Sequence, residues 1–174
     1  NMVRVIITTN FDPLMERALD EEEISYSVVT PDTNLKNVEP REHTSCRIIK
    51  PHGDWQELNL RNSDKEVADL PELLENELRE IFNRYGLVVM GYRGYEKERL
   101  VTLLNERSSP YGLYWLVRNE PEETAEEIVQ RQNGRWIRRE SADVFMSELE
   151  RKIQLFLERP ESQTPEMAAE EFVL

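Results

Sequence analysis

TTNFDPLMERAL, residues 8–19, comes directly after a run of apolar residues. The apolar run predicts a buried strand over Val3–Thr9, and the residues after it predict a short helix over Pro13–Leu19. Asp12 before Pro13 is what a helix start requires, because a carboxylate accepts an amide hydrogen bond and proline suits the first helical position. A buried strand that passes through polar residues into a helix is typical of α/β sheets.

Strands and helices alternate along the rest of the chain. Further strands are predicted at Ser25–Thr30, Cys46–Lys50, Leu87–Tyr92, Leu113–Val117 and Arg135–Arg138, and further helices at 70–82, Glu96–Arg107, Glu122–Gln132 and Ser141–Leu157. Strands that are apolar throughout, such as Leu87–Tyr92, are expected to be buried on both faces, as in a parallel sheet covered by helices. The sequence therefore predicts a doubly wound, Rossmann-like α/β domain with a mainly parallel sheet and helices on both faces, over residues 1–158.

Helical periodicity predicts the core faces of two helices. In the helix near residue 70, apolar residues recur at spacings of three and four; they are Leu70, Leu73, Leu74, Leu78, Ile81 and Phe82. Asp69, with Glu72 three residues later, predicts the start of this helix. The last helix uses Phe145, Leu149, Ile153 and Phe156. Residues 31–44 are predicted to be a loop, residues 55–69 an irregular lid or small insertion, and residues 159–174 an acidic, flexible tail.

Composition limits the classes of function. The chain has 174 residues and a net charge of −13, so its field repels nucleic-acid phosphates and we expect no direct nucleic-acid binding. The densest basic run, Arg135–Arg139, is predicted to be a solvated strand edge. No apolar run is long enough to span a membrane, and the start of the chain lacks the pattern of a secretion signal. Cys46 is the single cysteine, which excludes an internal disulfide and a multi-cysteine zinc site. These features predict a reduced, cytoplasmic protein.

Polar and glycine residues follow the predicted strands, at the edge where doubly wound sheets bind ligands. They are Asn10 and Asp12 after the first strand, His52 and Asp54 after Cys46–Lys50, Gly91, Arg93, Gly94 and Glu96 after the fourth, and Arg118 and Asn119 after Leu113–Val117. Each has an ordinary structural explanation as well. Asp12 can cap a helix, His52 can be a turn residue, and the glycines can let the chain turn. Asn10 needs partners for its amide, which a turn or a ligand could provide.

Together these stretches resemble a known family. TTNFDPLMERAL, IIKPHGDW, LVVMGYRGYE, GLYWLVRNE and SADVFMSEL occur in the order and rough spacing of the sirtuin-like domains that use NAD. The chain is more similar to the bacterial and archaeal branch of that family, in which NAD hydrolysis and phage defence are known. The resemblance covers most of residues 3–150. Its specific part is the Asn-x-Asp element with the His-Gly pair, and the Gly-Tyr-x-Gly element supports it.

The resemblance implies roles for individual residues. It implies that Asn10 and Asp12 hold the nicotinamide ribose, the carboxamide and an ordered water, and that His52 is the catalytic base. The residues implied to contact NAD are Thr9, Asn10, Asp12, Gly91, Tyr92, Arg93, Gly94 and Asn119; those implied to be catalytic are His52 and Asn10. NAD would be the substrate. No metal would be needed, because cleavage of the nicotinamide–ribose bond gives a cationic sugar, for which a base and an oriented water suffice.

The chain departs from the family's pattern in three ways. The family's glycine-rich phosphate loop lies on an earlier strand, but only Asn1 and Met2 precede Val3, so we expect the fold to be incomplete at its N-terminal strand. The cysteine pairs of the family's zinc module are missing. Arg93 stands where the family has a serine, and a guanidinium there could clasp phosphate or block the pocket.

Two functions follow from this pattern. The intact parent protein is expected to hydrolyse NAD to ADP-ribose and nicotinamide, in phage defence, whereas this segment alone is expected to be inactive. The alternative is a degenerate, non-catalytic module that binds a partner protein or senses a nucleotide without cleaving it. The sequence leaves a homo-oligomer and a partner protein open, and predicts NAD or a related nucleotide as the ligand.

Overall fold

The structure is a computed structural model that describes residues 2–33, 35–41, 43–55, 69–94 and 98–158. Contacts divide the chain into two compact units, and each unit is built on a three-stranded parallel sheet. The first unit contains Asn1–Arg84 and Tyr95–Ser108, and the second contains Tyr85–Gly94 and Ser109–Leu174. The predicted insertion at 55–69 and the predicted tail at 159–174 lie almost wholly outside the described residues.

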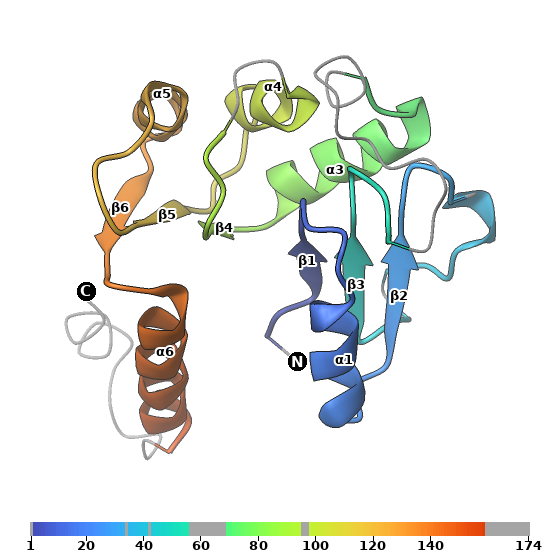
Figure 1. The fold of residues 1–174 in the computed structure, drawn as a ribbon, viewed down its shortest axis with the longest axis horizontal. Helices are drawn as coiled ribbons and strands as arrows, with labels where there is room; N and C mark the ends of the chain where they lie inside the picture. Colours follow the sequence, from blue (N-terminus) through green and yellow to red (C-terminus); the bar gives the residue numbers. More distant parts are fainter. Residues whose placement is uncertain (1, 34, 42, 56–68, 95–97, 159–174) are drawn as a thin grey trace. The chain divides into compact units, whose positions relative to one another are not determined.

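The first sheet has the strand order β1-β3-β2, and its arrows in Figure 1 point the same way. Its strands are β1 (Val5–Ile7), β2 (Tyr26–Val29) and β3 (Cys46–Ile49). All residues of β3 are buried because it has a neighbour on each side, whereas β1 is half-buried, since it pairs with β3 alone among the described strands. β1 is shorter than predicted and Val3 is 54% exposed, so the prediction of a buried strand from Val3 is wrong at its start.

Two of the four helices in this unit are linked by ion pairs to the central strand of the first sheet. The helices are α1 (Leu14–Glu21), the 3-10 helix η1 (Leu35–Asn37), α3 (Glu72–Arg84) and α4 (Arg99–Asn105). Lys50, which follows β3, binds Glu16 of α1, whereas Arg47 within β3 binds Glu77 of α3. Residues three apart along an extended strand point to opposite faces. α1 and α3 therefore cover opposite faces, as a doubly wound sheet requires.

Three details of the first unit differ from the prediction. Residues 31–44 contain η1 rather than loop alone. α3 begins at Glu72, directly after Pro71, instead of at Asp69, and the Glu75 N–H donates to the Pro71 carbonyl. Leu73 is 49% exposed although the rest of its apolar stripe is buried, because it lies about 100° around the helix from Leu74, on the flank that faces solvent.

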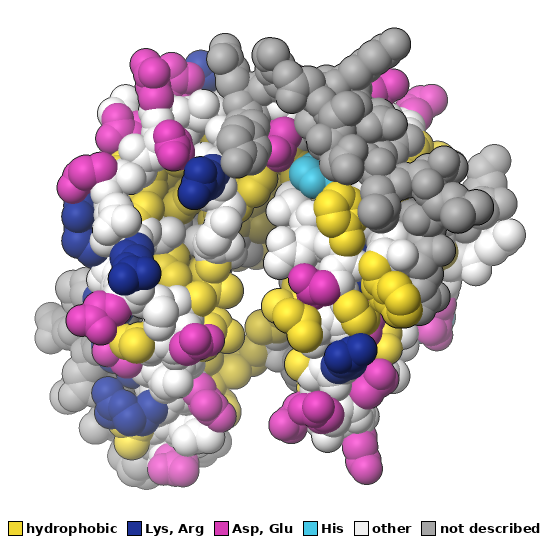
Figure 2. All heavy atoms as spheres, in the orientation of Figure 1, with side chains coloured by type: hydrophobic (Ala, Val, Ile, Leu, Met, Phe, Trp, Pro, Cys, Tyr) yellow, Lys and Arg dark blue, Asp and Glu magenta, His cyan; other side chains and the backbone are white. Residues whose placement is uncertain are grey.

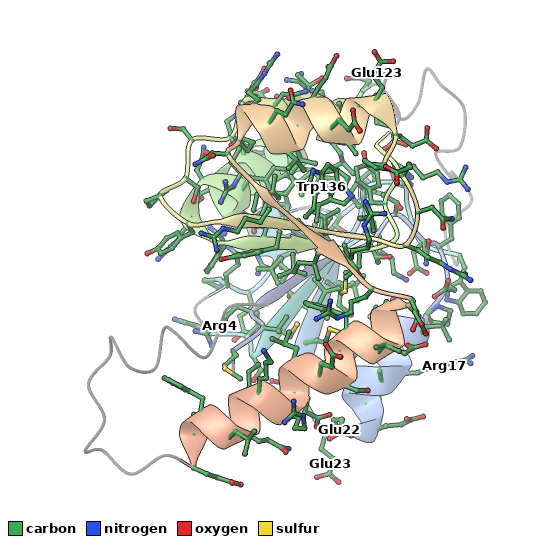
Figure 3. The ribbon with its side chains drawn as sticks, turned by 90° about the vertical axis from the view of Figure 1, so that its left-hand side faces the viewer. Arg4, Arg17, Glu22, Glu23, Glu123 and Trp136 are labelled. Carbon is green, nitrogen blue, oxygen red and sulfur yellow. The ribbon has the colours of Figure 1, made fainter. Side chains whose placement is uncertain are left out.

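The second sheet has the strand order β4-β5-β6, also parallel. Its strands are β4 (Leu87–Val89), β5 (Leu113–Val117) and β6 (Arg135–Arg138), and its helices are α5 (Glu123–Arg131) and α6 (Ala142–Leu157). Figure 1 shows α5 and α6 on opposite sides of β6. Phe145 of α6 packs with Leu116 and Ile137 of the sheet. Trp136 points to the other face, and Figure 3 shows it between β6 and α5, with Glu123 on the outer side of that helix.

Two expectations about burial in the second unit are wrong. In β4, predicted to be buried on both faces, Val88 is 47% exposed, whereas Leu87 and Val89, which point to the other face, are partly buried. Phe156 near the end of α6 is 46% exposed rather than part of the core, while Leu149 is partly buried against the cluster around Phe145. The basic run on β6 lies at a sheet edge with Arg135 and Arg138 exposed, which confirms that prediction.

The arrangement as a whole is α/β and Rossmann-like, with parallel sheets flanked by helices, which confirms the predicted fold class. Figure 2 shows acidic side chains spread over the face that it draws, in keeping with the net charge of −13. Among the described residues, none of the helices is both long enough and apolar enough to cross a membrane.

Candidate functional site

The turn after β1 carries the first group of predicted site residues. The Asn10 N–H donates to Thr8 Oγ1 at 3.2 Å, and Asp12 Oδ1 accepts from the Leu14 N–H at 3.1 Å. Asp12 thus satisfies an amide at the start of α1 as predicted, although Pro13 occupies the N-cap and not the first helical position. The exposed Asn10 side chain forms no hydrogen bond with any residue that the structure describes. Its amide is available to a ligand, and Thr9 beside it is partly buried.

The turn after β3 presents His52. The Gly53 N–H donates to the Lys50 carbonyl at 3.0 Å, which closes a four-residue turn with Pro51 second and His52 third. Proline suits the second position of such a turn because its φ is already fixed. Gly53 has φ of 100°, a backbone conformation that side chains disfavour. The sequence Lys-Pro-His-Gly therefore dictates the turn that holds His52 partly buried at its corner.

These two turns lie at the same sheet edge and are joined to each other. β1 and β3 are paired and parallel, with Ile7 opposite Ile49, so the residues after both strands emerge together. The Trp55 N–H donates to the Phe11 carbonyl at 3.0 Å. Lys50 Nζ donates to the Asp12 carbonyl at 2.8 Å. The structure thus brings the Asn10 turn and the His52 turn together within the first unit.

Lys50 is the centre of a buried ionic cluster behind these turns. Its side chain is fully buried, and Nζ lies 2.6 Å from Asp54 Oδ2 and 2.5 Å from Glu16 Oε1. Burial lowers the pKa of Lys50, but the hydrogen bonds that its ammonium donates to Asp54 and Glu16 outweigh burial, so the pKa is raised overall. The other oxygen of Glu16, Oε2, is buried and has no hydrogen-bond partner among the described residues. The charged lysine therefore links the end of β3, the His52 turn and α1 through ion pairs and hydrogen bonds.

His52 has an acid–base property that suits proton transfer. Burial lowers its pKa from the ordinary value of 6.5, and the negative charge of Glu98 opposes this shift without cancelling it. Glu98 is 5% exposed and precedes the first residue of α4. The imidazole is therefore neutral at neutral pH, which is the form that accepts a proton.

The predicted site residues after β4 lie in the second unit. Gly91 and Gly94 have φ of 67° and 75°, so both glycines are required by the backbone of this turn. The Tyr92 ring stacks on Trp115, with ring centroids 6.1 Å apart, so the tyrosine has a packing role in the sheet. Arg93 is exposed. Of this group, the arginine is the side chain most open to a ligand.

A pocket lies at the carboxyl ends of β5 and β6. Its volume is about 440 Å³, and it is lined by Arg118, Asn119, Arg138, Arg139 and Glu140. Asn119 was predicted to contact the ligand and Arg118 to lie at the same ligand-binding edge, whereas Arg138 and Arg139 were predicted to belong to a solvated strand edge. The pocket belongs to the second unit, at the kind of edge where doubly wound sheets bind ligands.

The described part of the chain contains no cluster of side chains that could bind a metal ion. Among those residues, no group of three or more His, Cys, Asp or Glu side chains could hold a metal ion. Cys46 is buried in β3, and burial raises the pKa of its thiol, which disfavours the thiolate that a metal would need.

A parallel α/β architecture with polar turns at its carboxyl edge defines a Rossmann-like class of fold, in which ligands bind at that edge. The family model described as a SIR2-like domain matches residues 4–137, which is more than half of the chain. The chain therefore belongs to the SIR2-like domain family, which is NAD-related, and this confirms the resemblance to sirtuin-like domains. A comparison with curated proteins found no match.

Sequence reasoning missed the residues that support the predicted site. Lys50 was read as the last residue of a strand, and neither Glu16 nor Glu98 was singled out. A signal did exist for Lys50, since a charged residue ends the otherwise apolar run Ile48–Ile49 directly before Pro51. Glu98 left no comparable signal, because its burial beside His52 depends on the tertiary structure.

Proposed function

We propose that this chain is the substrate-binding and catalytic part of a sirtuin-like enzyme that hydrolyses NAD to ADP-ribose and nicotinamide. The observation that carries the proposal is the joined pair of turns, which holds an exposed Asn10 amide and a neutral His52 imidazole at one edge of the sheet. Membership of the NAD-related SIR2-like family supports NAD as the substrate.

In the proposed reaction, the bond between nicotinamide and ribose breaks and nicotinamide leaves with the bonding electrons. A water molecule adds its oxygen to the ribose carbon, and its proton passes to the ring nitrogen of His52 and then to solvent. Asn10 orients the water or the carboxamide, because its amide offers two donors and one acceptor. Because burial lowers the pKa of His52, its ring is in the neutral form that can accept this proton.

The residues present fit the nicotinamide end of NAD better than its pyrophosphate. The Asn10 side chain has no described partner, and His52 is neutral and partly accessible. The described residues contain no glycine-rich loop that would hold the pyrophosphate. Among them, the turn of Gly91 and Gly94 has two glycines with positive φ, but these do not form such a loop. β1 and β4 each pair with a single described strand, so each has an edge at which a further strand could pair. We therefore assign the activity to the intact protein that contains this chain.

The test is the release of nicotinamide and ADP-ribose from NAD by the full parent protein. Equal amounts of both products would support the hydrolase and would exclude transfer of ADP-ribose to another acceptor. A protein that binds NAD but releases no nicotinamide would instead be a nucleotide sensor. A role in phage defence would require that cells carrying the parent protein lose NAD during infection, and that the His52→Ala variant does not cause this loss.

A non-catalytic interaction module is the second candidate. Large apolar side chains are exposed on two helices; they are Leu14 and Met15 of α1 and Leu155, Phe156 and Leu157 of α6. Exposed apolar groups of this kind are typical of surfaces that another protein covers. A parent protein that neither binds nor cleaves NAD would favour this module.

A further inference from the structure

Three arginines gather at the carboxyl end of the second sheet. Arg118 follows β5, Arg138 ends β6, and Arg139 comes next. All three line the pocket of about 440 Å³, together with Asn119 and Glu140. The ionisable side chains of the lining carry a net charge of +2, and the carboxylates of Glu120 and Glu148, which pair with Arg138 and Arg139, bring the whole cluster to neutrality. Because the whole chain carries −13, an anion is repelled less at this cluster than by the chain as a whole.

The three guanidinium groups differ in how firmly they are held. Arg139 is fixed, because Nε binds Glu148 Oε2 at 2.9 Å and Nη1 donates to the Arg138 carbonyl at 2.8 Å. Arg138 forms a longer contact, 3.3 Å, with the exposed carboxylate of Glu120. Such surface pairs exchange easily with another anion. Arg118 forms no ion pair with any residue that the structure describes.

The chemistry of the lining selects among anions. A guanidinium fork binds phosphate oxygens in a bidentate manner, which a single hydrated ammonium cannot do. Asn119 and the carboxylate of Glu140 suit neutral hydroxyl groups, and Glu140 disfavours a ligand that is anionic throughout. The combination fits a sugar that carries one phosphate. In other dinucleotide-binding folds, an arginine near the adenosine ribose accommodates its 2′-phosphate.

We propose that this pocket binds the ribose phosphate of a 2′-phosphorylated adenosine, so that the preferred substrate is the phosphorylated dinucleotide NADP rather than NAD. The claim that NADP is cleaved rests on the proposed function. The claim that the pocket binds the phosphorylated ribose does not require catalysis and can be tested by binding alone. Arg118 and Arg138 bind the phosphate, and Arg139 stays with Glu148 and shapes the wall.

The experiment titrates this chain, by calorimetry, with adenosine 2′,5′-bisphosphate and with adenosine 5′-monophosphate. The bisphosphate should bind about 10- to 100-fold more tightly, as expected for a charged hydrogen-bonded contact. Arg118→Gln should remove most of that preference and leave binding of the monophosphate unchanged. Arg118→Lys keeps the charge but loses the fork, so it should restore only part of the preference.

Arg135→Gln is the matched control, because Arg135 is exposed on the same strand as Arg138 and does not line the pocket. It makes the same change in charge and should leave both affinities unchanged. Equal affinities for the two adenosine phosphates would overturn the proposal, as would no measurable binding of either. Binding of inorganic pyrophosphate as tight as that of the bisphosphate, or equal losses in Arg118→Gln and Arg135→Gln, would show attraction of any anion and would also overturn it.

Failure of the proposed function gives a different result. If the parent protein releases no nicotinamide from either dinucleotide while the chain still prefers the bisphosphate, the reaction is wrong and the pocket assignment stands. If nicotinamide is released from NAD and NADP with equal kcat/KM and the chain shows no preference, the reaction stands and the pocket assignment is wrong.

Discussion

The ammonium group of Lys50 donates a hydrogen bond to the backbone carbonyl of Asp12 at 2.8 Å, and so joins the end of β3 to the start of α1. The same ammonium binds the carboxylates of Asp54 and Glu16. One buried cation therefore holds the turn of His52 against the turn of Asn10. The candidate site depends on this contact, although Lys50 was not among the residues predicted to form it.

Replacing Lys50 by methionine should destabilise the fold strongly. The change keeps the length of the side chain but leaves the largely buried carboxylates of Glu16 and Asp54 without a counter-charge. Breaking a buried ion pair in this way costs about 3–5 kcal/mol. Urea unfolding followed by circular dichroism measures the loss. Lys152→Met on α6 is the control and should change the free energy of unfolding by less than about 0.5 kcal/mol. A Lys50→Met protein as stable as the control would contradict the role of the cluster.

The pKa of His52 should lie below 6.5 and should fall further in Glu98→Gln. Burial disfavours the imidazolium, while the charge of Glu98 partly stabilises it, so removing that charge leaves burial unopposed. A titration followed by the NMR signals of the histidine ring measures both values, and needs no activity. A His52 pKa at or above 6.5, or a rise in Glu98→Gln, would show that the ring is not in the environment described.

The same shift predicts how stability depends on pH. Because the pKa of His52 is lower in the folded state, the unfolded chain binds the proton more readily as the pH falls below 6.5. The contribution of neutral His52 is present above that pH and is lost as the pH falls towards the folded pKa. Urea unfolding from about pH 8 to about pH 5 should therefore show wild type losing stability relative to His52→Gln. Parallel curves would contradict the shift.

Gly53→Ala should destabilise the protein by about 1–3 kcal/mol, because a side chain would be held at φ of 100°. Gly86→Ala is the control: Gly86 is not among the glycines with positive φ, and an added Cβ would meet its nearest neighbours at 3.5 Å, an ordinary contact. Thermal melting of the two variants makes the comparison. Equal melting temperatures would mean that the His52 turn tolerates a side chain at Gly53.

This chain, expressed alone, should bind NAD feebly, with Kd at or above about 1 mM. The reason is that the described residues lack a glycine-rich cradle of backbone amides for the pyrophosphate. Isothermal titration with NAD is the measurement. Micromolar binding would require that another group, such as the exposed guanidinium of Arg93, takes over the role of the cradle.

Local patterns were enough to predict the elements and the edge where the site lies. The alternation of apolar strands and amphipathic helices predicted the α/β class, and the residues after β1 and β3 were correctly expected at one edge, since β1 and β3 are parallel neighbours. Burial was predicted less well. Val88 and Leu73 are exposed because burial depends on which neighbours cover a strand or helix, and composition does not record that.

The supporting contacts could not be predicted from the sequence. Lys50, Glu16 and Asp54 meet only after α1 has packed against the sheet, so no short motif contains all three. The pocket at Arg118 and Arg138 joins two loops that are twenty residues apart and become neighbours through the β5–β6 pairing. The roles of Asn10, His52 and Gly91 towards NAD remain predictions that only ligand binding and kinetics test.

If His52 is the base of a reaction that releases nicotinamide, its role is measured by the rate of that release by the parent protein. NAD and NADP are measured in parallel, for wild type, His52→Ala, Asn10→Ala and the exposed control His43→Ala, with folding checked by thermal melting. We predict that His52→Ala lowers the rate roughly 10²- to 10⁴-fold, that Asn10→Ala lowers it comparably, and that His43→Ala leaves it unchanged. A folded His52→Ala variant that releases nicotinamide as fast as wild type would show that His52 is not the base.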